Sequence, residues 1–337
     1  MTNIKKIPFI FAILSFLTFF TSANSEIKVV TSIKPIHSLA SYLMEGVGRP
    51  SLIVDGYASP HGFAMKPSHA KMLQEADIIF WVGEGLENFL EKPLKTVAKN
   101  AEKIELIEIK ALNKLKFRER NIFDDHDHDE HGHDDHGKKE DDHDHDHDDH
   151  GKKDDDHDDH GHDDHDGHAH GEFDPHIWLD PVNAKVILKE MAEHLIENDE
   201  KNSSIYKKNL AKALKDIDKL IKNTKSELSK SVASIVFHDA YQYFEERFNV
   251  NILGAFTVNT DVMPGAEQLA EVREIIEHEK VACVFSEPQF NPDIIKAVAK
   301  DMDIKTGVVD PLGATLNPGK DLYFKLIQNM STSFKNC

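Results

Sequence analysis

The 337-residue chain has only two cysteines, Cys283 and Cys337. Neither lies near the end of the apolar run at the N-terminus, so we expect no lipid to be attached there through a cysteine. A single pair suits a disulfide in an oxidising compartment, which would stabilise the fold by roughly 4 kcal/mol if chain entropy is the main contribution. The alternative is two free thiols, one in a core strand and one at the end of the chain.

Two further absences exclude kinds of function. The chain has no HExxH motif, the helix that carries two zinc ligands and a general base in many metalloproteases. It also has no excess of positive charge, because 60 acidic residues against 40 basic ones give a formal net charge of −20. Such a chain repels phosphate, so we expect no nucleic-acid partner.

Apolar side chains are almost absent from Asp124 to His170, which we call the His/Asp-rich segment. It has 22 acidic residues and four lysines, so it carries −18 of the net charge and leaves the rest of the chain nearly neutral. It cannot bury enough surface to offset its ordering entropy, so we predict disorder unless metal folds it. It contains 15 of the 22 histidines: His126, His128, His131, His133, His136, His143, His145, His147, His150, His157, His160, His162, His165, His168 and His170.

The mixture of imidazoles and carboxylates in this segment favours a borderline divalent ion. Imidazole suits zinc, copper, nickel and iron, whereas carboxylates alone suit calcium, magnesium or manganese. Zinc or nickel, bound weakly at several positions, is therefore our first interpretation. A segment that only keeps the protein soluble is the alternative, but Asp and Glu would do that without histidine.

The first 25 residues have the layout of a secretory signal peptide. Two lysines precede an apolar run, Ile7–Phe20, and small and polar residues follow at 21–25. The run is short for a membrane span, which needs about 20 residues, so an uncleaved anchor is the less favoured alternative. We expect cleavage near Ala23 or Ser25 and export of a soluble mature protein.

About 265 residues remain outside these two segments, more than one compact core usually holds, so two domains are expected. In each half, short apolar runs alternate with helical patterns, which predicts an α/β fold with one open parallel sheet per lobe. The predicted strands are Ile27–Thr31, Ser51–Val54, Ile78–Val82, Ile104–Ile107, Ser234–Phe237, Ile252–Ala255, Ala282–Phe285 and Lys305–Val309. The predicted helices are Ile36–Met44, Ser68–Glu75, Phe89–Lys99, Ala240–Phe248, Ala266–His278 and Pro292–Asp301.

One long helix is predicted between the halves, at Ser203–Lys230, because this stretch lacks Gly and Pro and its apolar residues recur at three- and four-residue spacings. A helix of about 27 residues is some 40 Å long, so it can join two lobes while limiting how far they swing. An ordinary surface helix gives the same pattern. The expected division is a signal peptide at 1–25, a first lobe at 26–123 and 171–202 interrupted by the segment at 124–170, a bridging helix at 203–230 and a second lobe at 231–337.

Three histidines outside the His/Asp-rich segment are candidate metal ligands. His61 lies in a turn after the strand at 51–54, and His238 follows the strand at 234–237, positions where open parallel sheets bind ligands. His176 lies just before a helix expected near Pro181, and Asp310 follows the last strand. Three imidazoles with a carboxylate or water make a four-coordinate zinc site, whereas manganese would favour more carboxylates. The pattern alone leaves open whether these residues converge.

The other four histidines lie within predicted helices. His37 and His69 belong to helices of the first lobe, and His194 and His278 lie on charged helix faces. We expect solvated or capping roles for all four rather than metal ligation.

Several motifs, in order along the chain, resemble those of the metal-binding subunits of ABC importers, the cluster A-I solute-binding proteins. The motifs are Ser59-Pro60-His61, Lys66-Pro67-Ser68, Asp174-Pro175-His176-Ile177-Trp178-Leu179-Asp180-Pro181, Phe237-His238-Asp239-Ala240-Tyr241 and Asp310-Pro311-Leu312-Gly313. The resemblance runs over essentially the whole mature chain. It is to the zinc branch of the family, in which a histidine in the Phe-His-Asp-Ala motif and a His-rich insertion are typical, whereas manganese relatives tend to have Glu at that position.

The resemblance implies two βα lobes bridged by a rigid helix, with zinc as the transported ligand in the cleft. His61 and His176 would come from the first lobe, and His238 and Asp310 from the second, where the two cysteines would form the family's disulfide. It also implies a periplasmic location, with an inner-membrane permease and its ATPase as partners. A periplasmic zinc chaperone is a further candidate partner, and we expect a monomer.

One departure from the family concerns the fourth ligand, because some zinc members have Glu where this chain has Pro60. We therefore expect the fourth coordination position to be filled by Asp310, a water or a histidine of the His/Asp-rich segment, in that order of preference. Our hypothesis is high-affinity zinc capture without enzymatic activity. A zinc hydrolase, with Glu287 or Asp239 as the general base, and a metal buffer or sensor that acts through the His/Asp-rich segment are the alternatives.

Overall fold

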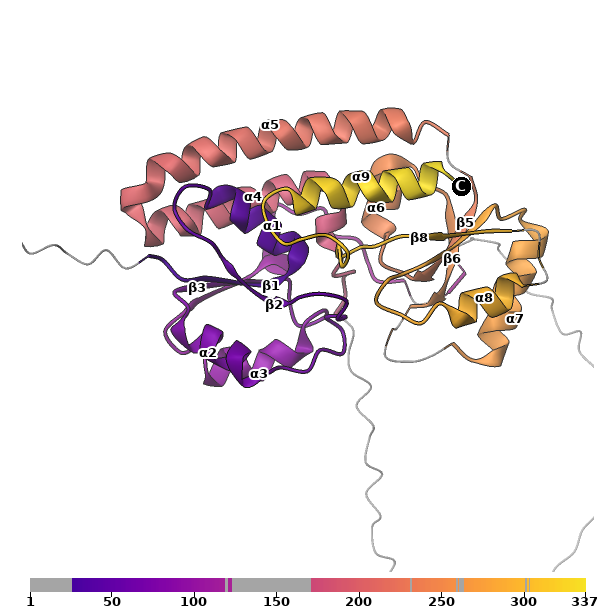
Figure 1. Ribbon diagram of the computed structural model, residues 1–337, viewed down its shortest axis with the longest axis horizontal. Helices are drawn as coiled ribbons and strands as arrows, with labels where there is room; N and C mark the ends of the chain where they lie inside the picture. The colour runs from indigo at the N-terminus through magenta and orange to yellow at the C-terminus, as the bar shows by residue number, and fades with distance from the viewer. Residues whose placement is uncertain are drawn as a thin grey trace, which may run out of the picture.

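The computed structural model describes residues 26–118, 121–122, 171–230, 232–258, 260, 264–300, 302 and 304–337. The predicted signal peptide and the His/Asp-rich segment lie outside the described residues, so the expectations for both stay predictions. The described chain forms two α/β lobes side by side, with one long helix running along both (Figure 1). This architecture confirms the predicted two-lobed parallel-sheet fold.

The first lobe is built on a parallel four-stranded sheet with strand order β2-β1-β3-β4. β1 and β3 lie in its centre and are buried throughout, because helices cover both faces of the sheet (Figure 1). The strands are β1 (Val29–Ile33), β2 (Ser51–Val54), β3 (Ile78–Trp81) and β4 (Glu102–Glu105). The helices are α1 (Lys34–Leu43), α2 (Pro67–Glu75), α3 (Asn88–Thr96) and the 3-10 turn η1 (Leu106–Glu108).

The second lobe repeats this topology, with strand order β6-β5-β7-β8 in a second parallel sheet. Successive residues of β5 face opposite sides: Ile235 and Phe237 join a small core beneath α7 and α8, whereas Val236 joins the main core. The strands are β5 (Ser234–His238), β6 (Ile252–Thr257), β7 (Cys283–Ser286) and β8 (Lys305–Val308). The helices are α6 (Gln242–Phe248), α7 (Ala266–His278) and α8 (Asp293–Ala299).

A layer of helices joins the lobes (Figure 1). It consists of α4 (Pro181–Asn198), preceded by the 3-10 turn η2 (Ile177–Leu179), then the turn η3 (Glu200–Asn202), α5 (Ser203–Glu227) and α9 (Leu322–Lys335). α5 has 25 residues and is therefore about 37 Å long. The main hydrophobic core runs without a break from β1 in the first lobe to α9, so the lobes share one interior.

Polar contacts also cross between the lobes. Arg247 of α6 forms a two-pronged pair with Asp180 at the start of α4, with both N–O distances 2.7 Å. The indole N–H of Trp178 donates to the carbonyl of Pro311 at 2.8 Å, and the hydroxyl of Tyr323 donates to the carbonyl of Trp178 at 2.8 Å. Since Asp180 and Trp178 are buried, these bonds fix the chain just before α4 against the second lobe.

The two cysteines form a disulfide between β7 and the end of the chain, with Cα atoms of Cys283 and Cys337 5.8 Å apart. The predicted pairing is thus confirmed. Among the helices of the described residues, none has the length and apolar character that a membrane span requires.

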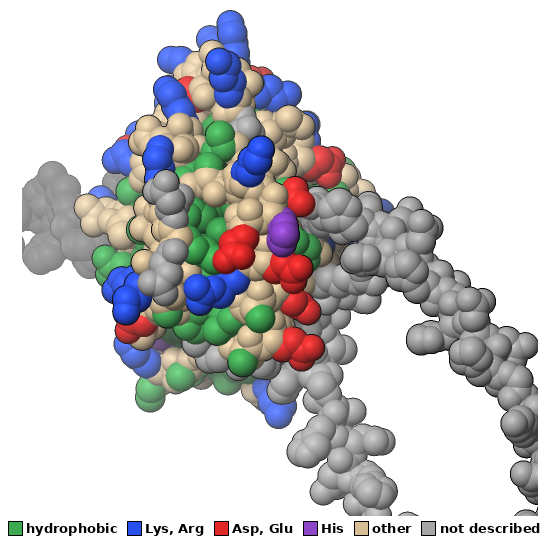
Figure 2. Space-filling model, turned by 90° about the vertical axis from the view of Figure 1, so that its right-hand side faces the viewer, with side chains coloured by type: hydrophobic (Ala, Val, Ile, Leu, Met, Phe, Trp, Pro, Cys, Tyr) green, Lys and Arg blue, Asp and Glu red, His purple; other side chains and the backbone are tan. Residues whose placement is uncertain are grey.

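The surface of the second lobe's outer end carries charges of both signs (Figure 2). α7 contributes exposed Glu267, Glu271 and Glu274 to this lobe, and α8 contributes exposed Lys296. Such mixing agrees with the near-neutral balance expected outside the His/Asp-rich segment.

The predicted strands are all present: Ser51–Val54 has the predicted bounds, and the others have ends shifted by one or two residues. The predicted long helix is also present and ends at Glu227 rather than Lys230. The sequence analysis missed α9, although Leu322, Leu326, Met330 and other buried residues recur along one face of it. The boundaries proposed for the domains remain a prediction.

Candidate metal centre

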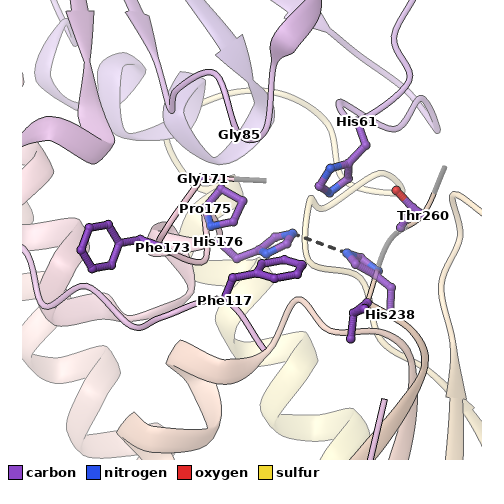
Figure 3. A pocket seen from close by; sticks show the side chains of 10 residues that line it. His61, Gly85, Phe117, Gly171, Phe173, Pro175, His176, His238 and Thr260 are labelled. Atoms are coloured by element: carbon purple, nitrogen blue, oxygen red, sulfur yellow. Dashed lines mark hydrogen bonds between the residues drawn. The ribbon is translucent and has the colours of Figure 1, made fainter. Parts of the chain in front are cut away.

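His61 lies in the loop between β2 and α2, beyond the carboxyl end of β2 as predicted. The loop turns at Ser59-Pro60-His61, where the backbone N–H of His61 donates to the Ser59 hydroxyl at 3.3 Å. The imidazole extends from the first lobe toward the other two candidate histidines (Figure 3). Pro60 offers no donor atom from its side chain, so the first lobe supplies an imidazole at this point without a carboxylate beside it.

His176 is held in place by Asp174, two residues before it. Asp174 Oδ1 accepts the backbone N–H of His176 at 2.9 Å and lies 2.7 Å from Nδ1 of the same ring. One carboxylate oxygen therefore fixes both the turn and the imidazole, and Nε2 is the ring nitrogen that faces the other histidines. The hydroxyl of Tyr243, from the second lobe, donates to the carbonyl of Asp174 at 2.8 Å and steadies this turn from the other side.

His238 ends β5, and Glu287 follows β7, the neighbouring strand. The strand order of the second sheet reverses between β5 and β7, which is where open α/β sheets bind ligands. Glu287 Oε1 lies 2.7 Å from His238 Nδ1 and accepts the hydroxyl of Tyr241 at 2.9 Å. Both His176 and His238 thus use Nδ1 on a buried carboxylate, the arrangement that orients histidine ligands of metal ions.

The three predicted histidines meet between the lobes (Figure 3). One ring nitrogen of each lies within 4.8 Å of the others, and no other His, Cys, Asp or Glu cluster of this kind occurs in the described part of the chain. His176 Nε2 and His238 Nε2 are 3.4 Å apart. Two nitrogens bound to one tetrahedral zinc, at about 2.0–2.1 Å each, are separated by about 3.3 Å. The spacing of these two donors therefore fits a single zinc ion.

Two small cavities border the histidines, one on the side of Phe117 and Phe173 and the other on the side of Trp178 and Leu312. Each has a volume of about 10 Å³, which is room for roughly one water-sized sphere. The space is too small for an organic substrate and large enough for an ion or a water.

Burial and hydrogen bonding decide which histidine holds a proton. Burial, assisted by the neighbouring His238, lowers the pKa of His176 well below its usual range. Burial also opposes a charge on His238, but the attraction and hydrogen bond of Glu287 outweigh it and raise the pKa of His238. A metal ion would therefore compete mainly with a proton on His238.

The carboxylate behind His176 has a pKa of its own that depends on burial. Burial raises the pKa of Asp174 to about 7, although the backbone N–H of His176 and the charge of Arg118 act in the opposite direction. A dication on His176 would favour ionised Asp174 in the same way as Arg118, so metal binding and ionisation of this group support one another.

Arg118, which precedes the His/Asp-rich segment in the sequence, contacts the second lobe. Its guanidinium lies 3.0 Å from Asp239 Oδ1 and 3.0 Å from Glu245 Oε2. Burial raises the pKa of Asp239 and of Glu245 to about 7, and Arg118 offsets part of this effect. Asp239, one of the two general bases considered from the sequence, is thus engaged in an ion pair beside His238.

Asp310 is not part of the histidine cluster. Its Oδ1 accepts the side-chain N–H of Gln289 at 3.0 Å and the backbone N–H of Leu312 at 3.2 Å, and its Oδ2 accepts the backbone N–H of Thr315 at 3.4 Å. The sequence placed Asp310 correctly after β8. A position at the end of a strand, however, does not determine which hydrogen-bond donors the carboxylate contacts. Its role as a ligand stays a prediction, and the histidines of the His/Asp-rich segment lie outside the described residues.

The remaining described histidines lie outside the cluster. His69 accepts the backbone N–H at the start of α2, which is the capping role expected, and His278 is exposed on α7. His194 lies 2.8 Å from a glutamate carboxylate. The expectation of a solvated or capping His37 is wrong, because its ring is buried and Nε2 lies 3.1 Å from a backbone carbonyl.

Sequence reasoning did not establish which carboxylates orient His176 and His238. Asp174 stood inside a recognised motif, and its position two residues before His176 was the available signal. Glu287 was weighed only as a base or a supporting group, and Tyr241 and Gln289 were not considered. No periodic pattern marks them, because each acts across strands or turns.

Fold and cluster together define a class: a two-lobed α/β protein with three histidines between its lobes, able to hold one small metal ion. The sequence model of the family described as "Zinc-uptake complex component A periplasmic" matches residues 29–337, so the chain belongs to that family. The resemblance inferred from the motifs is confirmed.

Two relatives show how far the similarity extends. The "High-affinity zinc uptake system protein ZnuA" of Brucella abortus (strain 2308) is 45% identical over 317 residues, covering 94% of this chain and 92% of that protein. The protein of the same name from Yersinia pestis is 36% identical over 312 residues, covering 92% of this chain and 90% of that one. The chain therefore matches these relatives over nearly their whole length.

Solved structures show the same fold at lower sequence identity. The structure titled "Crystal structure of 138-173 ZnuA deletion mutant plus zinc bound" has a TM-score of 0.70 at 21% identity, covering 93% of this chain and 98% of that one. The "Periplasmic zinc binding protein TroA from Treponema pallidum" has a TM-score of 0.69 at 15% identity, covering 93% and 99%. At these identities the likeness supports the fold alone.

Proposed function

We propose that this protein captures zinc with high affinity in the periplasm and delivers it to an ABC importer. The observation that carries the proposal is the convergence of His61, His176 and His238 on one ion-sized space, two of them oriented by carboxylates. Its curated relatives are named as components of zinc uptake systems, and their match over most of the chain supports the same role.

The donor set favours zinc over manganese. Three imidazoles leave one position of a tetrahedral zinc for a water or another ligand, whereas manganese favours carboxylate and water oxygens in an octahedral arrangement. We propose Asp310, a water or a histidine of the His/Asp-rich segment as the fourth donor. The zinc ion is cargo in this proposal, bound reversibly and passed on.

The other parts of the chain would serve capture and delivery. The His/Asp-rich segment would attract dications and hold them loosely near the cleft, an effect that salt should weaken. An inner-membrane permease and its ATPase would be the partners, with a periplasmic zinc chaperone as a further candidate. The protein would act as a monomer after loss of its signal peptide.

A zinc hydrolase is the main alternative, since three histidines and a water are also a catalytic arrangement. Both carboxylates considered as its general base have other partners. Asp239 pairs with Arg118 at 3.0 Å, and Glu287 holds His238 Nδ1 at 2.7 Å. These contacts support a binding function, and the absence of turnover on ester, peptide and phosphate substrates by the zinc-loaded protein would support it further.

The test is competitive zinc titration of the full chain against a tight chelator, which keeps weak binding to the His/Asp-rich segment out of the measurement. Replacing His61, His176 or His238 with alanine should remove the tight site, because each supplies one of three ligands. His278→Ala, at an exposed position on α7, is the matched control and should bind zinc as tightly as the unchanged protein. Full affinity in all three cluster variants would refute the proposal.

Deletion of residues 124–170 separates capture from buffering. If the folded lobes capture zinc, the deletion variant should retain one tight site, once circular dichroism has established that it is folded. If it binds no metal and supports no growth at low zinc, the buffer or sensor alternative is correct instead.

A further inference from the structure

A short stretch of chain crosses from the first lobe to the second just before the His/Asp-rich segment. We call its described residues the strap: 115–118 and 121–122. The backbone N–H of Phe117 donates to the carbonyl of Glu172 at 3.2 Å. The backbone N–H of Asp174 donates to the carbonyl of Leu115 at 2.9 Å. The strap is therefore the antiparallel partner of the residues that lead to His176.

Side chains of the second lobe hold the strap from the other side. Gln242 Nε2 donates to the carbonyl of Lys116 at 3.0 Å. Arg118 lies 3.0 Å from Asp239 Oδ1 and contacts both carboxylate oxygens of Glu245, at 3.0 and 3.1 Å. Since hydrogen bonds between charged groups are roughly twice as strong as those between neutral ones, Arg118 makes the strongest of these attachments.

The strap ends on β6, the strand at the edge of the second sheet. The carbonyl of Asn121 accepts the backbone N–H of Ala255 at 2.8 Å, and Ile122 pairs with Gly254 in the antiparallel direction. A β-carbon at Gly254 would lie 2.6 Å from the Asn121 oxygen, so the glycine allows this close approach. Because β6 is an edge strand, the strap can detach from it without breaking the sheet.

The strap also forms one wall of the metal site. Phe117 lines the small cavity beside His176 (Figure 3). Gly171 and Phe173, which follow the His/Asp-rich segment in the sequence, line the same cavity. The wall on the opposite side includes Trp178, which is fully buried and bonded to the second lobe. Both flanks of the His/Asp-rich segment thus border the site at the wall that the strap builds.

We propose that the strap controls how fast zinc enters and leaves the site, and that Arg118 is the positioning residue that holds it closed. This inference rests on the proposed function, since it concerns access to the same three histidines. No described residue of the strap belongs to the histidine cluster, so detaching the strap exposes the ion to water without removing a ligand. Loosening the strap therefore raises the rates of zinc binding and release by the same factor and leaves the affinity unchanged.

The experiment compares the full chain with three variants, each of which loosens the strap in a different way: Arg118→Gln, Glu245→Gln and Gly254→Ala. Each protein, loaded with one zinc ion per chain, is mixed with excess chelator, at concentrations where the release rate no longer depends on the chelator. The Kd is measured separately by chelator competition, and the binding rate follows as the release rate divided by Kd.

Release should be about tenfold faster or more in Arg118→Gln and Glu245→Gln, because each weakens hydrogen bonds between charged groups and the open fraction grows accordingly. Gly254→Ala should act in the same direction, since its methyl group overlaps the carbonyl of Asn121. In all three variants the Kd should stay unchanged. Gly265→Ala, where a β-carbon meets no atom within 4 Å, is the matched control and should change neither rate.

The choice of variants separates the strap from the charge around the site. Arg118→Gln and Glu245→Gln change that charge in opposite directions, so faster release in both cannot come from electrostatic attraction of the ion. Gly254→Ala changes no charge at all. If Arg118→Gln does not fold, because it leaves two buried carboxylates without this partner, the other two variants carry the test. Circular dichroism establishes which variants are folded.

Two results would overturn the inference while leaving the proposed function intact. One is an unchanged release rate in any variant that folds. The other is faster release matched by an equal loss of affinity, which would mean that the strap supports the ligands instead of controlling access. Failure of the proposed function would look different. The unchanged protein would then bind zinc no more tightly than His238→Ala.

Discussion

A change at Glu287 is the most direct test of how neighbouring groups control the zinc affinity of the site. It is almost fully buried, at 3% exposed, and its Oε1 accepts hydrogen bonds from both His238 and Tyr241. In Glu287→Gln the amide oxygen can still accept from His238, so the ring keeps its orientation but loses the adjacent negative charge. Changes to such supporting groups lower metal affinity by about 10- to 100-fold, and we expect a loss in this range at pH 7.5.

The pH dependence of this loss follows from the pKa of His238. Glu287 raises that pKa above its usual value of 6.5, so a proton competes with zinc in the unchanged protein from a higher pH than in Glu287→Gln. Below the pKa, zinc affinity falls about tenfold per pH unit for each proton displaced. As pH decreases, the unchanged protein therefore loses affinity first, and the difference between the two proteins should shrink.

Chelator competition on the full chain at pH 7.5, 6.5 and 5.5 measures both effects. Tyr241→Phe is the control, because it removes one hydrogen bond to Glu287 and keeps the charge, so it should show a smaller loss and no shift of the profile to lower pH. The reasoning is refuted if Glu287→Gln binds zinc as tightly as the unchanged protein at pH 7.5, or if the difference between them grows as the pH falls.

Three further predictions concern stability. Burial raises the pKa of Glu87 to about 7 from 4.5, so stability is lost as pH rises through this window. Because Glu87 accepts the backbone N–H groups of Val82 and Gly83, Glu87→Gln exchanges one acceptor for a donor at every pH, so the prediction concerns the pH dependence. In urea unfolding the loss of stability between pH 4 and pH 8, up to about 3 kcal/mol, should be absent from Glu87→Gln. Replacing Cys283 and Cys337 with serine should lower the free energy of unfolding by about 4 kcal/mol while the folded protein still binds zinc. Arg247→Met leaves the carboxylate of Asp180 buried without its partner, which should cost about 3 kcal/mol by thermal unfolding, and Asp180→Asn in the same chain should recover part of it.

The central strands of the sheets were predictable because they are buried on both faces. Two examples are the four-residue, mainly apolar runs at Ile78–Trp81 and Cys283–Ser286. Such runs are too short for a helix, and helical patterns separate each from the next strand. α9 could have been found from the same kind of pattern. Its burial against α1 and α5, however, depends on contacts between chain segments far apart in sequence, which periodicity does not reveal.

The candidate site was predictable in its residue types and not in its contacts. His61 and His238 were identified because a parallel sheet places strand ends at one edge, and His176 because of its motif. Their convergence depends on how the two lobes pack, so it could only be inferred from the family resemblance. The hydrogen bond between Gln289 and Asp310 joins side chains 21 residues apart at neighbouring strand ends, and no spacing rule predicts that pair.

The bonds between the lobes also indicate how the site should open. The sequence suggested that α5 alone limits lobe movement, but the turn that carries His176 is itself attached to the second lobe, through Tyr243 to Asp174 and through Trp178 to Pro311, each at 2.8 Å. We therefore expect His176 and His238 to keep their spacing when zinc leaves, and His61, on the β2–α2 loop, to move away from both. Structures of the zinc-loaded and zinc-free protein measure this directly, and a zinc-free form in which His176 separates from His238 while His61 stays in place would contradict it.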